Sequence, residues 1–317
     1  MNSNNPIRKV AIIGAGPMGL SLAGFLLNEV PVILVVRNND RSDHLRKHGI
    51  KSFDPGVKFS NNSPTIVSSI NDLKQFTDID LIFIATKSTS VDEVCKELKN
   101  IIQEDTITIS YQNGFNTGTE VISKLNSENI FRMVLYYGVF FDQDLKINFI
   151  FSSPPHFIGA LKNDQFSTCR KVAALLSECH IPTEFMEDLQ PEVWKKSLMN
   201  AATSPVCALT KTTIKEAMKM STRSLICDLL QEGILVANKA GIPLPTEFYQ
   251  KSIDYMDTLG DHYPSMVHDV HNQSPTEITQ LNEQIINLGA KYGLATVAHN
   301  TIVSLIKTID FKNIYKK

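Results

Sequence analysis

The chain has 317 residues, more than one hydrophobic core usually organises, so we expect two domains. Apolar residues make up 43% and charged residues 20% of the chain, a composition that excludes a disordered protein. The net charge of -2 lacks the positive excess that nucleic-acid phosphates require, so nucleic acid is not an expected partner.

The cysteines and the N-terminal apolar stretch both bear on the compartment. Five cysteines are odd in number and contain no CxxC pair, which favours free thiols in a reducing cytoplasm over a disulfide framework or a zinc site. The uncharged stretch from Val10 to Leu27 follows two basic residues, as in a signal peptide, but glycines and Pro17 interrupt it. No other run is long enough to span a bilayer. We therefore expect a cytoplasmic protein without a membrane partner.

In chain order, short β-branched runs alternate with helical patterns over the first half. Strands are predicted at 9–15 (KVAIIGA), 32–37 (VILVVR), 80–86 (DLIFIAT) and 106–112 (TITISYQ), with a helix after the first. Continuous apolar runs separated by helices predict a parallel sheet that is buried on both faces. Such a sheet binds its ligands at the carboxyl ends of the strands.

Beyond about Asp188 the pattern becomes helical. Amphipathic helices are predicted at 193–209, 224–241 and 276–293. Gly241 ends the second, and Ser274 opens the third with Pro275 in the first helical position. The predicted fold class is therefore α/β, with a Rossmann-type doubly wound sheet in residues 1–187 followed by an all-helical domain in residues 188–317. The cleft between the domains is the expected site.

A glycine-rich turn follows the first predicted strand and opens a helix. Its residues, Gly14-Ala15-Gly16-Pro17-Met18-Gly19, form a GxGxxG motif. In this context the first glycine permits a tight turn, the second lets a pyrophosphate approach the backbone, and the third lets helix and strand pack closely. The amino terminus of the helix favours the phosphates electrostatically. The motif predicts a dinucleotide site, and the alternative is a glycine turn in an unrelated α/β protein.

The second predicted strand ends at Arg37, where NAD enzymes usually carry an acidic residue that binds the ribose hydroxyls. An arginine can pair with a 2′-phosphate instead, so NADP (NADPH) is favoured, with Arg41 and Arg46 as further candidates. The alternative is that Arg37 is a solvated loop charge.

Five segments follow one another along the chain in this order: GAGPMG, DLIFIATKS, SYQNGF, EVWKKSLMNAATSPVCAL and YPSMVHDVHNQSPTEI. With these motifs and spacings, the chain resembles the ketopantoate reductase (2-dehydropantoate 2-reductase) family from end to end. The resemblance implies an NADP-binding Rossmann domain and a helical domain that binds the substrate. If the chain forms a homodimer, the helical domain would also make the dimer contacts. It also implies NADPH-dependent reduction of 2-dehydropantoate (ketopantoate) to (R)-pantoate, a step in pantothenate and coenzyme A biosynthesis.

The resemblance assigns roles to individual residues. It makes Lys196 the catalytic lysine and Glu277 the second catalytic group, with Asn200 and Ser265 as substrate contacts and Lys87 and Asn113 beside cofactor and substrate. The chemistry supports Lys196, because hydride delivery to a ketone needs a proton donor or fixed cation at the oxygen. Lys196, Asn200 and Ser204 also recur every four residues, so they share one helix face, and Ser204 is included as a substrate contact.

Each role has a plainer alternative. Lys196 can be a solvated helix charge like Lys195, and Ser265 can be a helix cap. Asn113-Gly114 is a common turn dipeptide. Glu277 fits a capping box, Ser274-Pro275-Thr276-Glu277, in which it would bond to the backbone of the cap residue. A metal site built on the histidines at 262, 268 and 271 is not expected, because nicotinamide-dependent ketone reduction needs none.

Several positions depart from the family pattern: Ser204 for an asparagine, His262 for another polar pocket residue, Thr279 and Glu283 for an acidic residue and a glycine, and Ala298 for a proline. The cofactor motifs are intact, whereas the substrate-facing ones are partly changed. The alternatives to ketopantoate reduction are therefore reduction of another 2-oxo acid and a non-catalytic NADP-binding regulatory protein.

Overall fold

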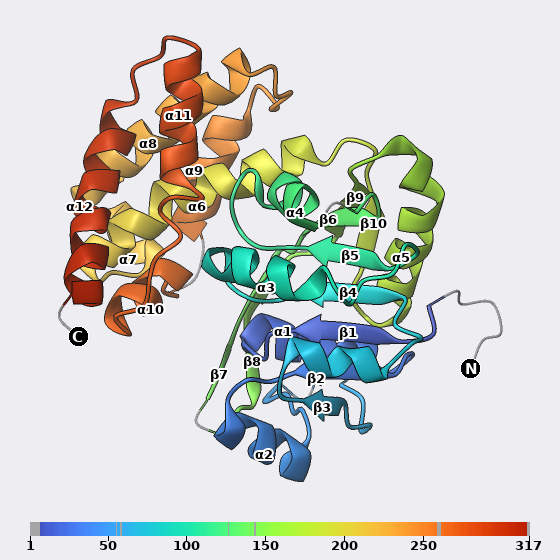
Figure 1. Ribbon diagram of the computed structural model, residues 1–317. Helices are drawn as coiled ribbons and strands as arrows, with labels where there is room; N and C mark the ends of the chain where they lie inside the picture. The colour runs from blue at the N-terminus through green and yellow to red at the C-terminus, as the bar shows by residue number, and fades with distance from the viewer. Residues whose placement is uncertain are drawn as a thin grey trace. The chain divides into compact units, whose positions relative to one another are not determined.

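A computed structural model describes residues 7–54, 56–57, 59–125, 127–142, 144–258 and 261–315. The chain divides into two compact units (Figure 1). The first comprises Met1–Gln112 and Thr117–Leu189, and the second comprises Asn113–Asn116 and Gln190–Lys317. The short segment Asn113–Asn116 thus belongs to the second unit although it follows a strand of the first.

The first unit is built on one twisted sheet. In the described residues its strands are β1 (Val10–Ile13), β2 (Val32–Val35), β3 (Thr65–Val67), β4 (Leu81–Ile84), β5 (Ile107–Ser110), β6 (Ile130–Val134), β9 (His156–Ala160) and β10 (Thr183–Phe185). Their order is β10-β9-β6-β5-β4-β1-β2-β3, and every neighbouring pair is parallel except β6 and β9. The four strands predicted from the sequence are confirmed. The order reverses at β1, which pairs with both β2 and β4, and such a switch point is where doubly wound sheets bind ligands.

Helices cover both faces of this sheet, as its apolar strands require. One face packs against α1 (Pro17–Leu26) and α5 (Phe166–Glu178), and the other against α3 (Val91–Leu98), α4 (Thr117–Leu125) and the short η1 (Ile70–Gln75). The remaining elements are α2 (Asn39–His48), η2 (Ser88–Ser90), η3 (Asn163–Gln165) and a hairpin of β7 (Tyr137–Phe141) and β8 (Ile147–Ser152). The doubly wound α/β prediction is confirmed.

The second unit is helical in its described residues. Its elements are α6 (Gln190–Thr210), α7 (Ile214–Lys219), α8 (Thr222–Lys239), α9 (Phe248–Thr258), α10 (Ser265–His271), α11 (Asn282–Lys291) and α12 (Val297–Tyr315). Helix α6 packs against α7, α8, α10 and α12, so it is the central helix of this unit. The predicted end of the second helix is confirmed, since Gly241 has a φ of 77°, a conformation that favours glycine.

The predicted start of the third helix is wrong. Helix α11 begins at Asn282, not at Ser274, and residues 278–281 form a turn that leads directly into it. Gln273 has a positive φ of 52°, and the Ser274 amide donates to the Asp269 carbonyl at 2.8 Å, so the chain is still completing the end of α10 there. The Ser-Pro signal therefore lies in an irregular connection rather than at a helix start.

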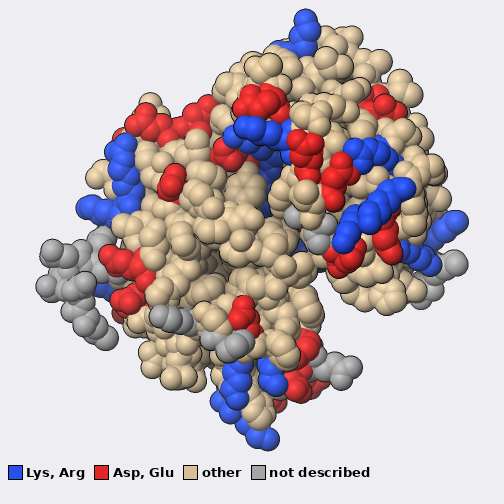
Figure 2. All heavy atoms as spheres, turned by 180° about the vertical axis from the view of Figure 1, so that it is seen from behind, with Lys and Arg blue, Asp and Glu red and all other residues tan. Residues whose placement is uncertain are grey.

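None of the helices in the described ranges is long and apolar enough to cross a membrane. On the face drawn in Figure 2, basic and acidic side chains are interspersed, as a net charge of -2 leads one to expect. The described cysteines are free thiols.

A buried polar network ties four helices of the second unit together. His299, fully buried on α12, bonds through Nε2 to the Leu229 carbonyl at 2.9 Å and through Nδ1 to the Asn282 amide nitrogen at 3.0 Å. The same amide nitrogen donates to the Ala201 carbonyl at 2.8 Å. The Leu229 carbonyl needs a donor and Asn282 needs an acceptor, so His299 is neutral and protonated on Nε2. Protonation of Nδ1 would break the bond to Asn282.

The burial of His299 predicts a pH-dependent stability. Desolvation lowers its pKa from 6.5 to about 4. Between these values the unfolded chain binds a proton that the folded chain excludes, so this contribution to stability is complete above pH 6.5 and is lost as the pH falls toward 4. The loss is about 3 kcal/mol, at about 1.4 kcal/mol per pKa unit. Urea unfolding between pH 7.5 and 4 measures it, and a His299→Asn variant that keeps the same slope would contradict it.

Candidate functional site

The glycine turn lies at the switch point of the sheet. Strand β1 ends at Ile13, and the turn leads into α1, which has Gly16 at its N-cap and Pro17 in its first turn. Gly14 has a φ of 113°, and a Cβ there would lie 2.9 Å from the backbone of Ala85, which follows β4. Glycine is therefore required where the ends of β1 and β4 meet.

The other two glycines of the motif differ in their surroundings. A Cβ on Gly19 would lie 2.0 Å from the Gly14 carbonyl oxygen, so this glycine permits the contact of α1 with the turn. A Cβ on Gly16 would meet nothing within 4 Å. The protein's own packing does not demand glycine at Gly16, whereas close approach of a phosphate group to the helix amino terminus does. The turn therefore fits a dinucleotide pyrophosphate.

The basic candidates of the first unit have different environments. Arg37, two residues beyond β2, pairs with Glu93 at 3.0 Å and with Glu97 at 3.4 Å, both on α3. Arg41 donates to the carbonyl of Ala15 in the glycine turn at 2.9 Å, and burial lowers its pKa.

Arg46 bonds to Asp43 and to the carbonyl of Ile66, and Lys87 is exposed after β4. The structure thus ties Arg41 to the turn, while Arg37 remains about half exposed, with 48% of its side chain accessible.

Helix α6 carries the predicted polar stripe of the second unit. Lys196 and Asn200 are half-buried and Ser204 is buried, all on one face of a continuous helix. Lys195 instead pairs with Glu192 at 2.6 Å, one turn back on the same helix. The two adjacent lysines point about 100° apart around the helix axis.

Glu277 does not form the alternative capping box, because no helix begins at Ser274. Its carboxylate accepts a hydrogen bond from the Asn113 side-chain amide at 3.3 Å, and only 9% of the residue is exposed. The residues after Asn113 also contact the segment that follows Glu277. The Phe115 amide donates to the Gln280 carbonyl, and a Cβ on Gly114 would lie 2.8 Å from that oxygen. Two site candidates 164 residues apart thus meet within the second unit.

Asp310 holds the residue before Glu277 in place, and no pattern in the sequence indicates this contact. The hydroxyl of Thr276 donates to Asp310 Oδ2 at 2.6 Å, and its backbone amide donates to Oδ1 at 3.3 Å. Thr276 is buried and Asp310 lies on α12, so the carboxylate anchors an irregular segment to a regular helix. Asp310 therefore helps to set where Glu277 is presented.

Replacing Asp310 with asparagine is expected to lower the free energy of unfolding by about 1 to 3 kcal/mol, because a charged acceptor of two hydrogen bonds is lost. The same change should lower kcat/KM through the displaced Glu277. Urea unfolding and steady-state kinetics measure the two effects. Thr276→Ser, which retains the hydroxyl, is the matched control, and an Asp310→Asn protein with unchanged stability would contradict the anchoring role.

Ser265 is exposed at the start of α10, which packs on α6, and Pro264 occupies the N-cap position. His268 and His271 are exposed, and His262 is half-buried. Within the described ranges, no group of three or more His, Cys, Asp or Glu residues is placed to hold a metal ion. That no metal is used stays a prediction.

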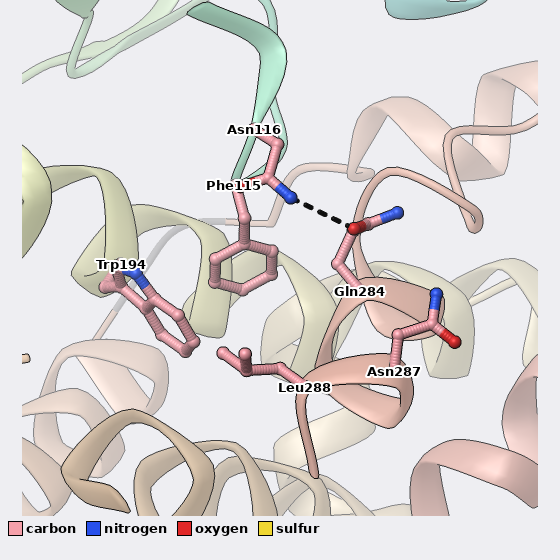
Figure 3. Close-up of a pocket in the computed structure, with 6 residues that line it drawn as sticks. All are labelled: Phe115, Asn116, Trp194, Gln284, Asn287 and Leu288. Carbon is pink, nitrogen blue, oxygen red and sulfur yellow. Dashed lines mark hydrogen bonds between the residues drawn. The ribbon is translucent and has the colours of Figure 1, made fainter. Parts of the chain in front are cut away.

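A cavity of about 240 Å³ lies in the second unit, and the sequence did not indicate it (Figure 3). Its lining residues are Phe115, Asn116, Trp194, Gln284, Asn287 and Leu288. The rings of Phe115 and Trp194 are 4.5 Å apart, and Asn116 donates to Gln284 at 3.1 Å. Because Trp194 and Lys196 are two residues apart on α6, they point about 200° apart around its axis. This cavity is therefore separate from the polar stripe.

Comparison with known proteins identifies the family. Residues 10–162 match the family model described as ketopantoate reductase PanE/ApbA, and residues 188–310 match that of the ketopantoate reductase PanE/ApbA C terminal. The chain belongs to the ketopantoate reductase family. It is therefore an oxidoreductase of the class that acts on a CH–OH group. A relative from Aquifex aeolicus (strain VF5), named 2-dehydropantoate 2-reductase, is 24% identical over 97% of this chain and 99% of its own length.

Solved structures show the same fold. A PanE/ApbA family ketopantoate reductase from Ralstonia eutropha JMP134 has a TM-score of 0.86 at 20% identity, over 97% of this chain and 100% of the other. D-mandelate dehydrogenase with NADH and anilino(oxo)acetate has a TM-score of 0.85 at 24% identity, over 96% and 99%. A dimeric ketopantoate reductase from Staphylococcus aureus has a TM-score of 0.77 at 22% identity, over 96% and 99%.

Proposed function

We propose that this protein reduces 2-dehydropantoate to (R)-pantoate with NADPH, and so contributes to pantothenate and coenzyme A synthesis. The observation that carries the proposal is the hydrogen bond between Asn113 and Glu277 in the unit that also holds Lys196. Three side chains that the family resemblance marks thereby occur in one compact unit. The names of the curated relatives support the substrate.

We infer that residues 1–187 bind the cofactor and residues 188–317 the substrate, with Asn113 contributed from the earlier part of the chain. The glycine turn would hold the pyrophosphate, because Gly16 leaves its side of the helix terminus open. Arg37 would pair with the 2′-phosphate, with Arg41 supporting the turn and Lys87 beside the cofactor. The bound nicotinamide supplies the hydride.

The residues of the second unit would complete the reduction. As the carbonyl carbon gains hydride, the oxygen gains negative charge, and the Lys196 ammonium gives it a proton so that an alcohol forms. Glu277, fixed by Asn113, would accept a hydrogen bond from a substrate hydroxyl and so orient the ketone toward Lys196. Asn200, Ser204 and Ser265 would hold the remaining polar groups of the substrate, including its carboxylate.

A second candidate is reduction of a different 2-oxo acid. The observation that favours it is the similarity to D-mandelate dehydrogenase, whose structure holds NADH and anilino(oxo)acetate. Ser204 is smaller than the asparagine of the family pattern and is buried on the stripe, so the pocket can differ in shape. The chemistry of Lys196 would be the same for both substrates.

The deciding experiment mixes purified protein with NADPH and ketopantoate and follows the loss of nicotinamide absorbance, with NADH and an aromatic 2-oxo acid in parallel. The highest kcat/KM for NADPH with ketopantoate is the expected result. A higher value for the aromatic acid would select the second candidate. Cofactor binding without turnover of any 2-oxo acid would favour a regulatory protein and overturn the proposal.

We also infer a cytoplasmic location and a homodimer. The free, mostly buried cysteines support a reducing compartment. The dimeric relative from Staphylococcus aureus supports self-association. Light scattering at several protein concentrations measures the assembly.

A further inference from the structure

Two carboxylates contact the arginine that the proposed function assigns to the cofactor. Arg37 Nη1 lies 3.0 Å from Glu93 Oε1, and Nη2 lies 3.4 Å from Glu97 Oε1. Glu93 and Glu97 are one turn apart on α3, so both side chains project from one face of that helix. One positive charge is thus shared by two negative charges.

All three groups can be reached by a ligand. The exposed fractions of the side chains are 48% for Arg37, 62% for Glu93 and 30% for Glu97. Arg37 follows β2, and α3 follows β4, so the trio lies beyond the carboxyl ends of strands that flank β1. In a doubly wound sheet this is the edge at which an adenosine ribose binds.

We propose that Glu93 and Glu97 limit the preference of this protein for NADPH over NADH. The proposal rests on the proposed function, in which Arg37 pairs with the 2′-phosphate. A 2′-phosphate must compete with both carboxylates for the guanidinium, and it is repelled by their charges. NADH has neutral hydroxyls at this position, and a carboxylate that accepts a hydrogen bond from them favours its binding. Glu93 and Glu97 therefore lower the NADPH-to-NADH affinity ratio and favour the use of both cofactors.

The size of the effect follows from the exposure of the groups. Charge interactions near a solvated surface are weak and are screened by salt, with a Debye length of about 10 Å at 0.1 M. We therefore expect each carboxylate to change the NADPH-to-NADH affinity ratio by about three- to ten-fold at low salt. The effect should shrink as the ionic strength rises.

The test measures the dissociation constants of NADPH and NADH by calorimetry for Glu93→Gln, Glu97→Gln and the double variant, at low and high ionic strength. We expect tighter NADPH binding in each variant, the largest gain in the double variant, and unchanged or weaker NADH binding. Glu29→Gln is the matched control, because Glu29 is an exposed acid that precedes β2, at the opposite end of that strand. It should leave the ratio unchanged.

Arg37→Gln separates failure of this inference from failure of the proposed function. If Arg37→Gln weakens NADPH but not NADH while the glutamine variants at 93 and 97 leave the ratio unchanged, the inference about the carboxylates is overturned and the role of Arg37 stands. If Arg37→Gln changes neither affinity, the assignment of Arg37 itself is wrong, and the inference fails with it. A gain that persists undiminished at high salt would also contradict the electrostatic argument.

Discussion

Replacement of Lys196 with alanine is expected to lower kcat/KM for the 2-oxo acid by about two to four orders of magnitude, the usual contribution of a positioned proton donor. The variant should fold, because Lys196 is only half-buried and alanine is favourable within a helix such as α6. Its affinity for NADPH should be nearly unchanged, since the glycine turn, Arg37 and Lys87, which are the main proposed cofactor contacts, lie in the first unit. Steady-state kinetics and calorimetry measure the two quantities.

Lys195 provides a matched control on the same turn of α6. Its ammonium pairs with Glu192 at 2.6 Å, so Lys195→Ala removes an equal charge from the same helix but not the stripe that carries Asn200. Because Glu192 is buried, loss of its partner should lower the free energy of unfolding by about 1 to 3 kcal/mol, whereas the activity should remain close to that of the parent. An equal loss of kcat/KM in Lys195→Ala and Lys196→Ala would mean that net charge, not the position of Lys196, explains the loss.

Lys196→Arg distinguishes the two ways in which a cation can assist. A guanidinium keeps the positive charge but does not readily give up a proton, whereas an ammonium does both. Activity near that of the parent would show that charge alone suffices and would contradict proton donation. Retained activity in Lys196→Ala would contradict the central claim.

The sheet was predictable because each strand is a local pattern. Continuous apolar runs such as 32–37 and 80–86 have few alternatives once glycines and helical segments bound them. The hairpin of β7 and β8 was not predicted, because its short connection at 142–146 contains no glycine or proline to mark a turn. The antiparallel pairing of β9 with β6 was not predicted either, because it joins residues 23 to 29 positions apart. Tertiary contacts determine such elements more than propensity does.

The site was predictable only where the family motifs mark residues one by one. The spacing of Lys196, Asn200 and Ser204 defines a helix face, and the structure has them on one helix. The partner of Glu277 was not predictable, because the Ser274–Glu277 pattern indicates a helix start and the contact with Asn113 spans 164 residues. The contacts of Asp310 with Thr276 and of Arg37 with Glu93 are likewise long-range ion or hydrogen-bond pairs, for which sequence spacing carries no information.

Two alanine substitutions in the glycine turn are expected to have opposite effects on stability and on NADPH affinity. Gly16 has a φ of -76° and a ψ of 177°, values that alanine adopts, and an added Cβ would meet no atom within 4 Å. Gly16→Ala should therefore change the free energy of unfolding by no more than about 1 kcal/mol. Its methyl group would occupy the space through which a pyrophosphate approaches the backbone, so we expect the dissociation constant of NADPH to rise by about ten-fold or more.

Gly19→Ala should have the opposite profile, because its Cβ would lie 2.0 Å from the carbonyl oxygen of Gly14 and backbone cannot yield as a flexible side chain can. Relief of that clash must displace α1 from β1, at a cost of about 3 kcal/mol or more in the free energy of unfolding. Urea unfolding without cofactor and calorimetry with NADPH measure both variants. A Gly16→Ala protein that binds NADPH like the parent would place the pyrophosphate elsewhere, whereas a stable Gly19→Ala protein would show that the turn is looser than its packing indicates.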